Sequence, residues 1–259
     1  MEEREVQYQV EAGQARLTIN REAARNALSP AVVTGLLEGL VAAEADESVR
    51  VVVLTGAGEK VFCAGGDLGG MSGDGFLSGH EGRRRYGVLL ERVSNCRVPV
   101  IARVNGHALA GGLGLMLACD LVVASETAGF GTPEIDRGLF PMMMMALLQR
   151  HLGRKRALEL MLLGERLDAK KALDWGMINQ VVLPTELDAA TEALAQKVAG
   201  KSRAILQLGR RAFYTTEDLP LSQAVETLAN YLSLNVLAED AAEGVTAFLE
   251  KRKPQWKDR

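Results

Sequence analysis

The chain carries two glycine-rich segments, VFCAGGDL at residues 61–68 and NGHALAGG at residues 105–112. Each follows a run of β-branched residues, at 50–55 and 98–104, and each leads into a segment with helical periodicity. Glycine lets backbone N–H groups turn toward a cavity with no Cβ in the way. The two segments therefore predict an oxyanion hole, in which one amide from each holds an oxygen atom that gains negative charge. Close packing of the backbone is an equally good explanation of the glycines alone.

Composition limits the class of protein. The chain has 259 residues, of which 47% are hydrophobic, so one sizeable core is expected. A net charge of −3 argues against a nucleic-acid partner. The acidic start MEERE and the interrupted apolar stretches predict neither a secretory signal nor a membrane span, so we expect a cytoplasmic protein. The three cysteines, Cys63, Cys96 and Cys119, are predicted to be buried free thiols.

The first half of the chain alternates predicted strands and helices, which indicates an α/β fold with right-handed crossovers. Ser29 and Pro30 predict a helix start, with serine as the N-cap. Residues 69–82 contain six glycines and are expected to form a mobile loop, either a lid or a long surface loop. Strands are predicted at 6–10, 15–19, 49–54, 98–104 and 120–124, and helices at 30–45, 83–96 and 110–119.

The second half is predicted to be almost entirely helical, with no low-complexity linker before it. We therefore expect one αβ core with a C-terminal helical layer. Helical periodicity is found at 142–151, 154–163, 169–175, 186–199, 202–215, 221–237 and 240–251.

Two nucleotide-binding readings of the glycines fail. The segment GAGEK at residues 56–60 lacks the Gly-Lys-Ser/Thr ending of a phosphate-binding loop. The segment GLG at residues 112–114 is followed by Leu117, where a dinucleotide fingerprint needs its third glycine. A third segment, GFGTPEI at residues 129–135, carries the carboxylate of Glu134 just past a predicted strand. Alone, such a residue is usually a solvated first-turn glutamate, so its meaning depends on whether it meets the glycine segments.

In this order, FCAGGDL, NGHALAGG and FGTPEI resemble the crotonase (enoyl-CoA hydratase/isomerase) superfamily, and the resemblance spans nearly the whole chain. It implies a spiral of ββα units with a C-terminal helical layer. Residues 1–196 would form the core with the acyl-CoA site, and residues 197–259 would cover coenzyme A and form the contacts of a homotrimer or homohexamer. Segments outside the three motifs also resemble the family, at residues 20–29, 162–167, 175–178 and 247–254.

The resemblance also implies the site. The substrate would be an acyl-CoA thioester whose carbonyl oxygen lies between the N–H groups of Gly66 and Gly111, and a proton next to that carbonyl could then leave. Coenzyme A would be part of the substrate, and neither a separate cofactor nor a metal is expected. The implied substrate-binding or coenzyme A-binding residues, besides the two glycines, are Arg25, Ala27, Ala64, Asp67, Leu68, Pro133 and Leu139.

The chain departs from the family pattern at Gly114. Family hydratases carry two glutamates, of which the first matches Gly114 and the second is retained as Glu134. Hydration needs a water and a proton donor, which two carboxylates provide between them. A single base suits isomerisation of a 3-enoyl-CoA to a 2-enoyl-CoA, with Glu134 carrying one proton between two carbons. Hydration by one glutamate, other enolate chemistry and a non-catalytic acyl-CoA-binding protein remain open, as does the acyl chain.

Other ionisable residues are weaker candidates. Asp67 is expected to cap or orient the first glycine segment, Asp136 to be structural or solvated, and His107 to be a packed histidine. Asp74, His80 and Glu81 in the expected loop are read as solvated, although they could supply a missing acid. Lys251 and Arg252 could reach a neighbouring subunit's nucleotide or balance the end of a helix.

Overall fold

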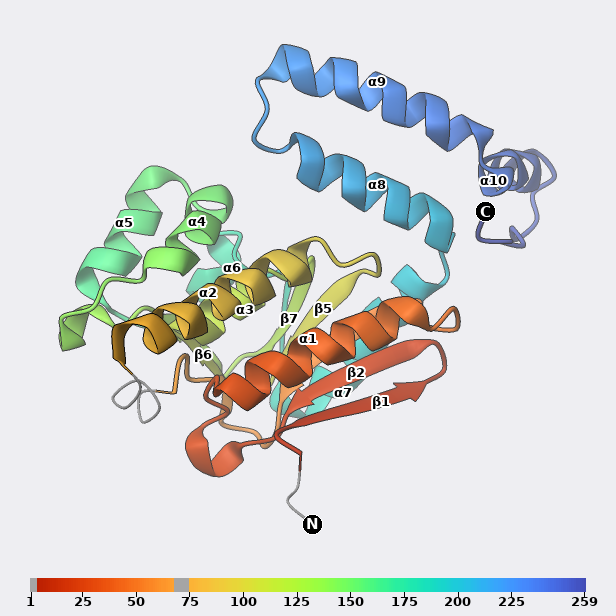
Figure 1. Ribbon diagram of the computed structural model, residues 1–259. Coiled ribbons are helices and arrows are strands. Elements are labelled where there is room, and N and C mark those ends of the chain that lie inside the picture. Colours follow the sequence, from red (N-terminus) through yellow and green to blue (C-terminus); the bar gives the residue numbers. More distant parts are fainter. Residues whose placement is uncertain (1–3, 68–74) are drawn as a thin grey trace.

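The computed structural model describes residues 4–67 and 75–259, and its strands form two sheets (Figure 1). The first sheet contains, in spatial order, β1 (Val6–Glu11), β2 (Gln14–Ile19), β3 (Val51–Gly56), β5 (Val100–Val104), β7 (Leu121–Ser125) and β10 (Gln180–Val182). The second contains β4 (Val61–Cys63), β6 (His107–Leu109), β8 (Gly129–Gly131) and β9 (Leu167–Asp168). Pairing is parallel except between β1 and β2 and between β8 and β9.

The order of elements along the chain produces a spiral. A strand of the first sheet is followed by a short strand of the second sheet and then by a helix. This order occurs in β3, β4 and α2 (Gly75–Ser94), and again in β5, β6 and α3 (Gly111–Leu117). The ββα spiral expected from the resemblance is therefore confirmed.

The first sheet is covered on both faces. Helix α1 (Pro30–Ala45) and helix α2 lie on one face, and α7 (Leu187–Ala199) lies on the other (Figure 1). Every residue of β3 is buried: Val52 belongs to the core beneath α1, and Val53 packs with Ala195 of α7. A strand buried on both faces needs an uninterrupted apolar sequence, which is why β3 could be predicted.

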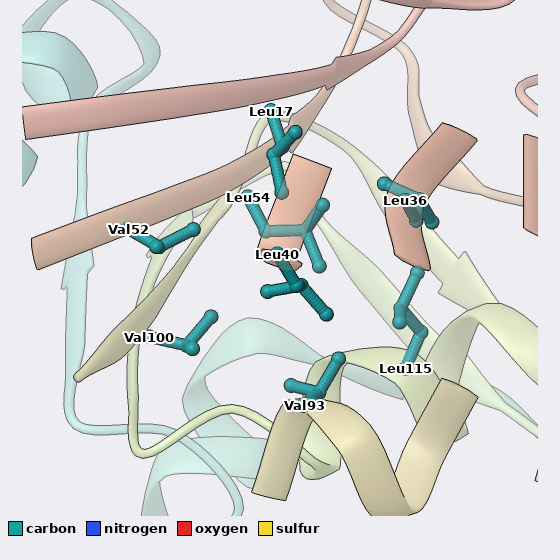
Figure 2. A pocket seen from close by; sticks show the side chains of 8 residues that line it. All are labelled: Leu17, Leu36, Leu40, Val52, Leu54, Val93, Val100 and Leu115. Carbon is teal, nitrogen blue, oxygen red and sulfur yellow. The ribbon is translucent and has the colours of Figure 1, made fainter. Parts of the chain in front are cut away.

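The core between α1, α2 and the sheet is aliphatic. Figure 2 shows Leu36 and Leu40 from α1 among side chains from the sheet, from α2 and from α3. The space among these side chains leaves no room for a water molecule, so the region is packing and not a binding site. Its residues are Leu17, Leu36, Leu40, Val52, Leu54, Val93, Val100 and Leu115.

The start of α1 has the predicted cap. The Ser29 hydroxyl accepts a hydrogen bond from the Val32 amide at 3.0 Å, and Pro30 is the first helical residue. The serine satisfies an amide that has no partner inside the helix, and the proline needs no such partner because it has no N–H group.

The second half of the chain is helical, as predicted. Its helices are α4 (Met142–His151), α5 (Arg154–Leu163), α6 (Ala169–Asp174), α8 (Arg203–Thr216), α9 (Leu221–Leu237) and α10 (Glu239–Leu249). Helices α8, α9 and α10 follow α7 and extend from the layered body (Figure 1). The expected boundary between residues 196 and 197 falls inside the last turn of α7. The division of the chain into two regions remains a prediction.

One local expectation is wrong. Residues 75–82, expected in a mobile loop, form the first turns of α2. Their glycines each cost about 1 kcal/mol in a helix, but Leu89, Leu90 and Val93 anchor the same helix in the core. Residues 68–74 of that expected loop lie outside the described residues. The list of predicted strands is also incomplete, because the glycine segments contain the short strands β4 and β6.

All three cysteines are buried and free, as predicted. Burial raises the pKa of the Cys63 and Cys96 thiols to about 12, so both stay protonated at neutral pH and are poor nucleophiles. In the part of the chain that the structure describes, no helix is both long and apolar enough to cross a membrane.

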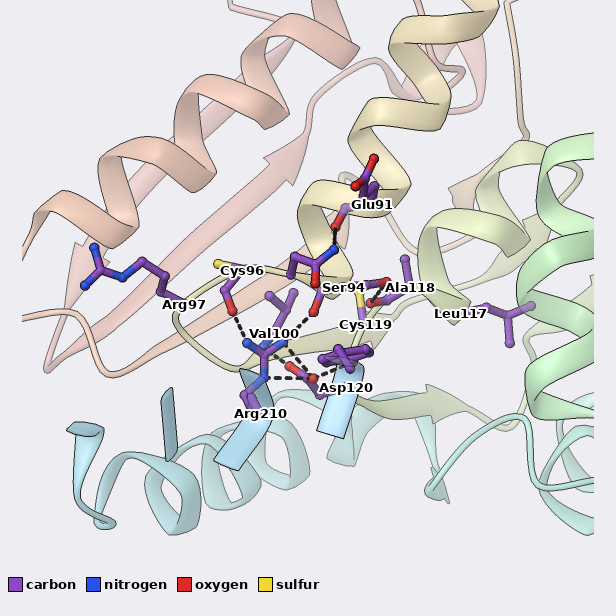
Figure 3. A network of polar contacts seen from close by, with 12 residues as sticks. Glu91, Ser94, Cys96, Arg97, Val100, Leu117, Ala118, Cys119, Asp120 and Arg210 are labelled. Carbon is purple, nitrogen blue, oxygen red and sulfur yellow. Dashed lines mark hydrogen bonds and ion pairs between the residues drawn. The ribbon is translucent and has the colours of Figure 1, made fainter. Parts of the chain in front are cut away.

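A half-buried ion pair fastens α8 to the first sheet (Figure 3). Asp120 accepts hydrogen bonds from Arg210 Nε and Nη2 at 2.9 and 2.8 Å, from the Tyr214 hydroxyl at 2.8 Å and from the Val100 amide at 2.7 Å. Arg210 also donates to the Cys96 carbonyl oxygen. The two charged side chains are 17% and 13% exposed, so each charge depends on the other for compensation.

Arg210→Met is expected to lower the free energy of unfolding by about 3 kcal/mol, because it leaves the Asp120 charge buried without its partner. The measurement is urea unfolding followed by circular dichroism. Arg150→Met is the matched control, since Arg150 pairs with Glu217 at 3.2 Å on the surface and should contribute less than about 1 kcal/mol. Equal losses in the two variants would contradict the anchoring role.

Candidate active site

The two glycine segments lie against each other. Strands β4 and β6 pair in parallel. Just after β4, Gly65 has a φ of +98°, a backbone conformation that residues other than glycine rarely adopt. A Cβ at Gly65 would lie 2.5 Å from the Ala110 Cβ and 3.0 Å from the Gly111 nitrogen. Glycine at this position is therefore a requirement of the contact between the segments.

The predicted oxyanion amides lie on this contact. Leu28 forms an isolated parallel β-bridge with Gly66. The Leu28 amide donates to the Gly65 carbonyl at 2.8 Å, and the Leu28 carbonyl accepts from the Asp67 amide at 3.3 Å. In this pairing the N–H of Gly66 points away from Leu28. A Cβ on the exposed Gly66 would meet nothing within 4 Å. Gly111 is the first residue of α3, where helix amides have no partner within the helix. Among the described residues, neither amide is thus expected to be paired within the secondary structure around it.

Ala110, between β6 and α3, has an unusual backbone conformation that the sequence did not predict. Its φ is 51° and its ψ is −133°. The Ala110 amide donates to the Gly131 carbonyl at 2.9 Å, and the Ala110 carbonyl accepts from the amide of Leu113 at 2.9 Å. Backbone strain of this kind, roughly 1–3 kcal/mol, persists where surrounding bonds enforce it, often at functional sites.

Glu134 reaches the same place through the second sheet. Strand β8 pairs with β6, and Leu109 lies opposite Gly131, three residues before Glu134. One Glu134 carboxylate oxygen, Oε2, is buried and has no hydrogen-bond partner among the described residues. Burial raises the pKa of Glu134, whereas a hydrogen bond from its own backbone amide and the Arg137 guanidinium act in the opposite direction. An orphaned, partly desolvated carboxylate is a suitable general base.

Tyr86, which the sequence reading missed, fills the space beside Gly114. Its hydroxyl donates to the Gly111 carbonyl at 2.7 Å, and a Cβ at Gly114 would overlap the hydroxyl oxygen. Burial raises the pKa of Tyr86, and the negative charge of Glu134 raises it further. A signal was available: Tyr86 shares a helical face with Leu89, Leu90 and Val93, at the spacing of an inward-facing stripe.

The turn before α1 fastens the first glycine segment. Arg21 Nη1 contacts Asp67 Oδ2 at 3.0 Å and donates to the Ala27 carbonyl at 2.9 Å. The buried Asn26 donates to the carbonyl of Val61 at 2.7 Å. Asp67 therefore orients its segment through an ion pair, and the sequence reading did not identify Arg21 as its partner.

The family model for enoyl-CoA hydratase/isomerase matches residues 9–259 of the chain. The chain belongs to this family. It is thus an acyl-CoA enzyme of the crotonase superfamily.

Members of the family resemble the chain over its length. A probable enoyl-CoA hydratase of Rhizobium meliloti (strain 1021) is 36% identical over 244 residues, which cover 94% of each chain. The 2,3-dehydroadipyl-CoA hydratase of Escherichia coli (strain K12) is 37% identical over 245 residues, again 94% of each chain. The crystal structure of the enoyl-CoA hydratase of Mycobacterium smegmatis superposes with a TM-score of 0.94 at 38% identity, covering 98% of this chain and 99% of that one.

The residues expected to bind coenzyme A in this family member border the glycine segments. Ala64 donates its amide to the carbonyl of the exposed Arg25 at 3.1 Å, and Ala27 lies in the same turn. Pro133 precedes Glu134, and the amide of Leu139 donates to the Glu134 carbonyl at 3.0 Å. Leu68 lies outside the described residues. The binding roles of all these residues remain predictions.

The weaker candidates lie elsewhere or have other partners. Asp136 is exposed, His80 stacks on Phe76, and Glu81 pairs with Arg84 at 3.2 Å. Burial lowers the pKa of His107. Asp74 lies outside the described residues, and among residues 4–67 and 75–259 no cluster of three His, Cys, Asp or Glu side chains could hold a metal ion.

Arg252 is engaged at the end of α10. It contacts Glu243 and Glu250, each at 2.6 Å. These contacts hold the pKa of Glu243 at about 2. Both roles considered for Arg252, at a neighbouring subunit's nucleotide and at the end of its own helix, remain predictions.

Glu134→Gln is expected to raise the melting temperature near neutral pH. Because burial raises the pKa of Glu134 in the folded state, the folded protein binds that proton more readily than the unfolded chain. The resulting stabilisation is complete below the ordinary pKa of 4.5 and is lost as the pH rises through the folded value. Scanning calorimetry between about pH 4 and pH 8 should show the variant's advantage shrinking toward acid.

Glu126→Gln, at an exposed position, controls for the loss of one negative charge. A difference between Glu134→Gln and wild type that stays constant with pH, or grows toward acid, would contradict a raised Glu134 pKa.

Proposed function

We propose that this enzyme isomerises a 3-enoyl-CoA thioester to the 2-enoyl-CoA, with Glu134 as its single acid and base. The observation that carries the proposal is the pairing of two facts at one site. Glu134 has a buried carboxylate oxygen without a partner. Position 114, where family hydratases carry a second glutamate, is a glycine with the Tyr86 hydroxyl in the space beside it. One carboxylate at the site supports chemistry that moves one proton.

The reaction follows from these groups. The thioester oxygen accepts hydrogen bonds from the amides of Gly66 and Gly111, and Glu134 removes a proton from C2. The electrons left on C2 join the 3,4 double bond in a dienolate whose negative charge rests largely on that oxygen. Glu134 then returns the same proton to C4, which leaves the double bond between C2 and C3. Each amide donor would lower the barrier by roughly 3 kcal/mol.

Hydration of a 2-enoyl-CoA is the second candidate, because the relatives described above are named hydratases. In that reaction water adds its oxygen to C3 and C2 receives a proton. Glu134 would then have to activate the water and supply the C2 proton unaided. Isomerisation makes no demand for a second carboxylate and is therefore the better match to Gly114.

The deciding assay uses 3-hexenoyl-CoA and 2-hexenoyl-CoA with wild type and Glu134→Gln. Wild type should convert the first without hydrating the second, and the variant should lose about 10²–10⁴-fold in kcat because its amide cannot carry the proton. Glu126→Gln, an exposed change of the same chemistry, should retain wild-type activity. Hydration of 2-hexenoyl-CoA by wild type would make the second candidate correct. Absence of C2 deuteration of hexanoyl-CoA in D₂O would instead favour a binding protein.

We also propose that the enzyme assembles as a homotrimer or homohexamer. None of the residues of α9 is buried, although the helix carries Leu221, Leu232 and Leu237, which are 81%, 63% and 80% exposed. Apolar side chains gathered on one element in this way usually mark an interface between proteins. A closed symmetric assembly would cover them.

Sedimentation equilibrium should give three or six times the mass of one chain. Leu232→Glu should shift the distribution toward smaller species, because the new carboxylate would be desolvated at the interface. Val41→Glu, at a 54% exposed position on α1, is the control and should leave the mass unchanged. A wild type that sediments as a monomer would exclude the proposed assembly.

A further inference from the structure

Tyr86 contacts the second glycine segment at Gly111 and also lies beside Gly114, the position where family hydratases carry a glutamate. It extends from α2 into the space between α2 and α3. Its hydroxyl donates to the Gly111 carbonyl at 2.7 Å, and a Cβ at Gly111 would lie 3.4 Å from both the phenol oxygen and Cζ. The phenol is therefore in contact with the residue whose amide is expected to hold the thioester oxygen.

The same hydroxyl occupies the space that a side chain at position 114 would need. A Cβ at Gly114 would overlap the Tyr86 oxygen and would lie 3.1 Å from the Met144 Cβ. Gly114 is buried within α3, so a longer side chain has little freedom to turn away. The second carboxylate is thus missing from the sequence, and its place in the structure is filled.

Two hydrogen bonds hold Gly111 from both sides. The Tyr86 hydroxyl donates to the Gly111 carbonyl at 2.7 Å. The Ala110 carbonyl, which shares a peptide group with the Gly111 nitrogen, accepts a hydrogen bond from the Leu113 amide at 2.9 Å. A glycine between two tethered peptide groups loses much of its conformational freedom. Since oxyanion stabilisation depends on donors that are already aimed, this tether bears directly on the Gly111 amide.

We propose that Tyr86 is a specificity-determining and positioning residue. Its ring and hydroxyl exclude a second catalytic side chain and the water it would hold, and its hydrogen bond fixes the Gly111 amide. The proposal rests on the proposed function, because it explains why the enzyme returns a proton to carbon and does not add water. Burial and the nearby Glu134 raise the Tyr86 pKa, so the hydroxyl remains a donor at neutral pH.

The claim that Tyr86 fills the space beside Gly114 is tested by melting temperature, which requires no activity measurement. Gly114→Glu should lower the melting temperature strongly in the wild-type background and much less when combined with Tyr86→Ala. Gly209→Glu, where a Cβ would meet nothing within 4 Å, is the control and should show no coupling to Tyr86→Ala. Equal effects of Gly114→Glu with and without Tyr86→Ala would overturn the claim that Tyr86 occupies this space.

The positioning part is tested with Tyr86→Phe, which keeps the ring and removes the hydroxyl. The rate of C2 deuteration of hexanoyl-CoA in D₂O should fall about tenfold, as expected for the loss of roughly 1.4 kcal/mol, with KM little changed. A purely structural role would lower the melting temperature and leave kcat intact. Such a result, or a change confined to KM, would overturn the positioning role.

The specificity part is tested with the double variant Tyr86→Ala/Gly114→Glu. Its hydration of 2-hexenoyl-CoA should exceed that of Tyr86→Ala by at least about tenfold, because a second carboxylate can now hold water. No gain in a folded double variant would overturn this part. If wild type itself hydrates 2-hexenoyl-CoA, the proposed isomerase function and the specificity claim both fail. The packing claim is then judged by the coupling in melting temperature, which is independent of the reaction.

Discussion

The close approach of two backbone segments at Gly65 and Ala110 is the constraint on which the rest of the site depends. A Cβ at Gly65 would lie 2.5 Å from that of Ala110, so the contact is possible only because Gly65 has none. The parallel pairing of β4 with β6 brings the segments to this point. From there the amides of Gly66 and Gly111 are within one site, and the pairing of β6 with β8 adds Glu134.

The remainder of the fold makes this contact rigid. The side-chain amides of Asn26 and Asn105 both donate to the carbonyl of Val61 at the start of β4, at 2.7 and 3.1 Å. These bonds connect the turn before α1 and the end of β5 to the second sheet through buried asparagines, where a hydrogen bond left unmade would be costly. The aliphatic core beneath α1 and α2 then fixes the strands that carry both segments. Preorganised donors need such support, because a loose amide would have to be reoriented during the reaction.

Most of the first sheet could be predicted from the sequence, whereas most of the second could not. The run Val51–Leu54 is apolar without interruption because β3 is buried on both faces, and this signal is unambiguous. Strands β4, β6 and β8 have three residues each and lie within or beside glycine-rich sequence, so periodicity cannot separate them from loops. Their pairing depends on partners more than 20 residues away in the chain. Similarly, the positive φ of Ala110 follows from its bonds to distant residues, since alanine has no intrinsic preference for it. The family motifs identified Gly66, Gly111 and Glu134, but the roles of these residues remain predictions.

The oxyanion donors proposed for this site are main-chain amides, which has a consequence for how the enzyme can change over time. Among single substitutions, only one to proline can delete such a donor, because every other residue supplies a backbone N–H group. Most substitutions therefore leave in place the amides that would stabilise charge. The side chains around it, at positions 86, 114 and 134, are free to vary one at a time. A lineage built on this scaffold can therefore exchange one reaction for another while its activation of the thioester is inherited intact.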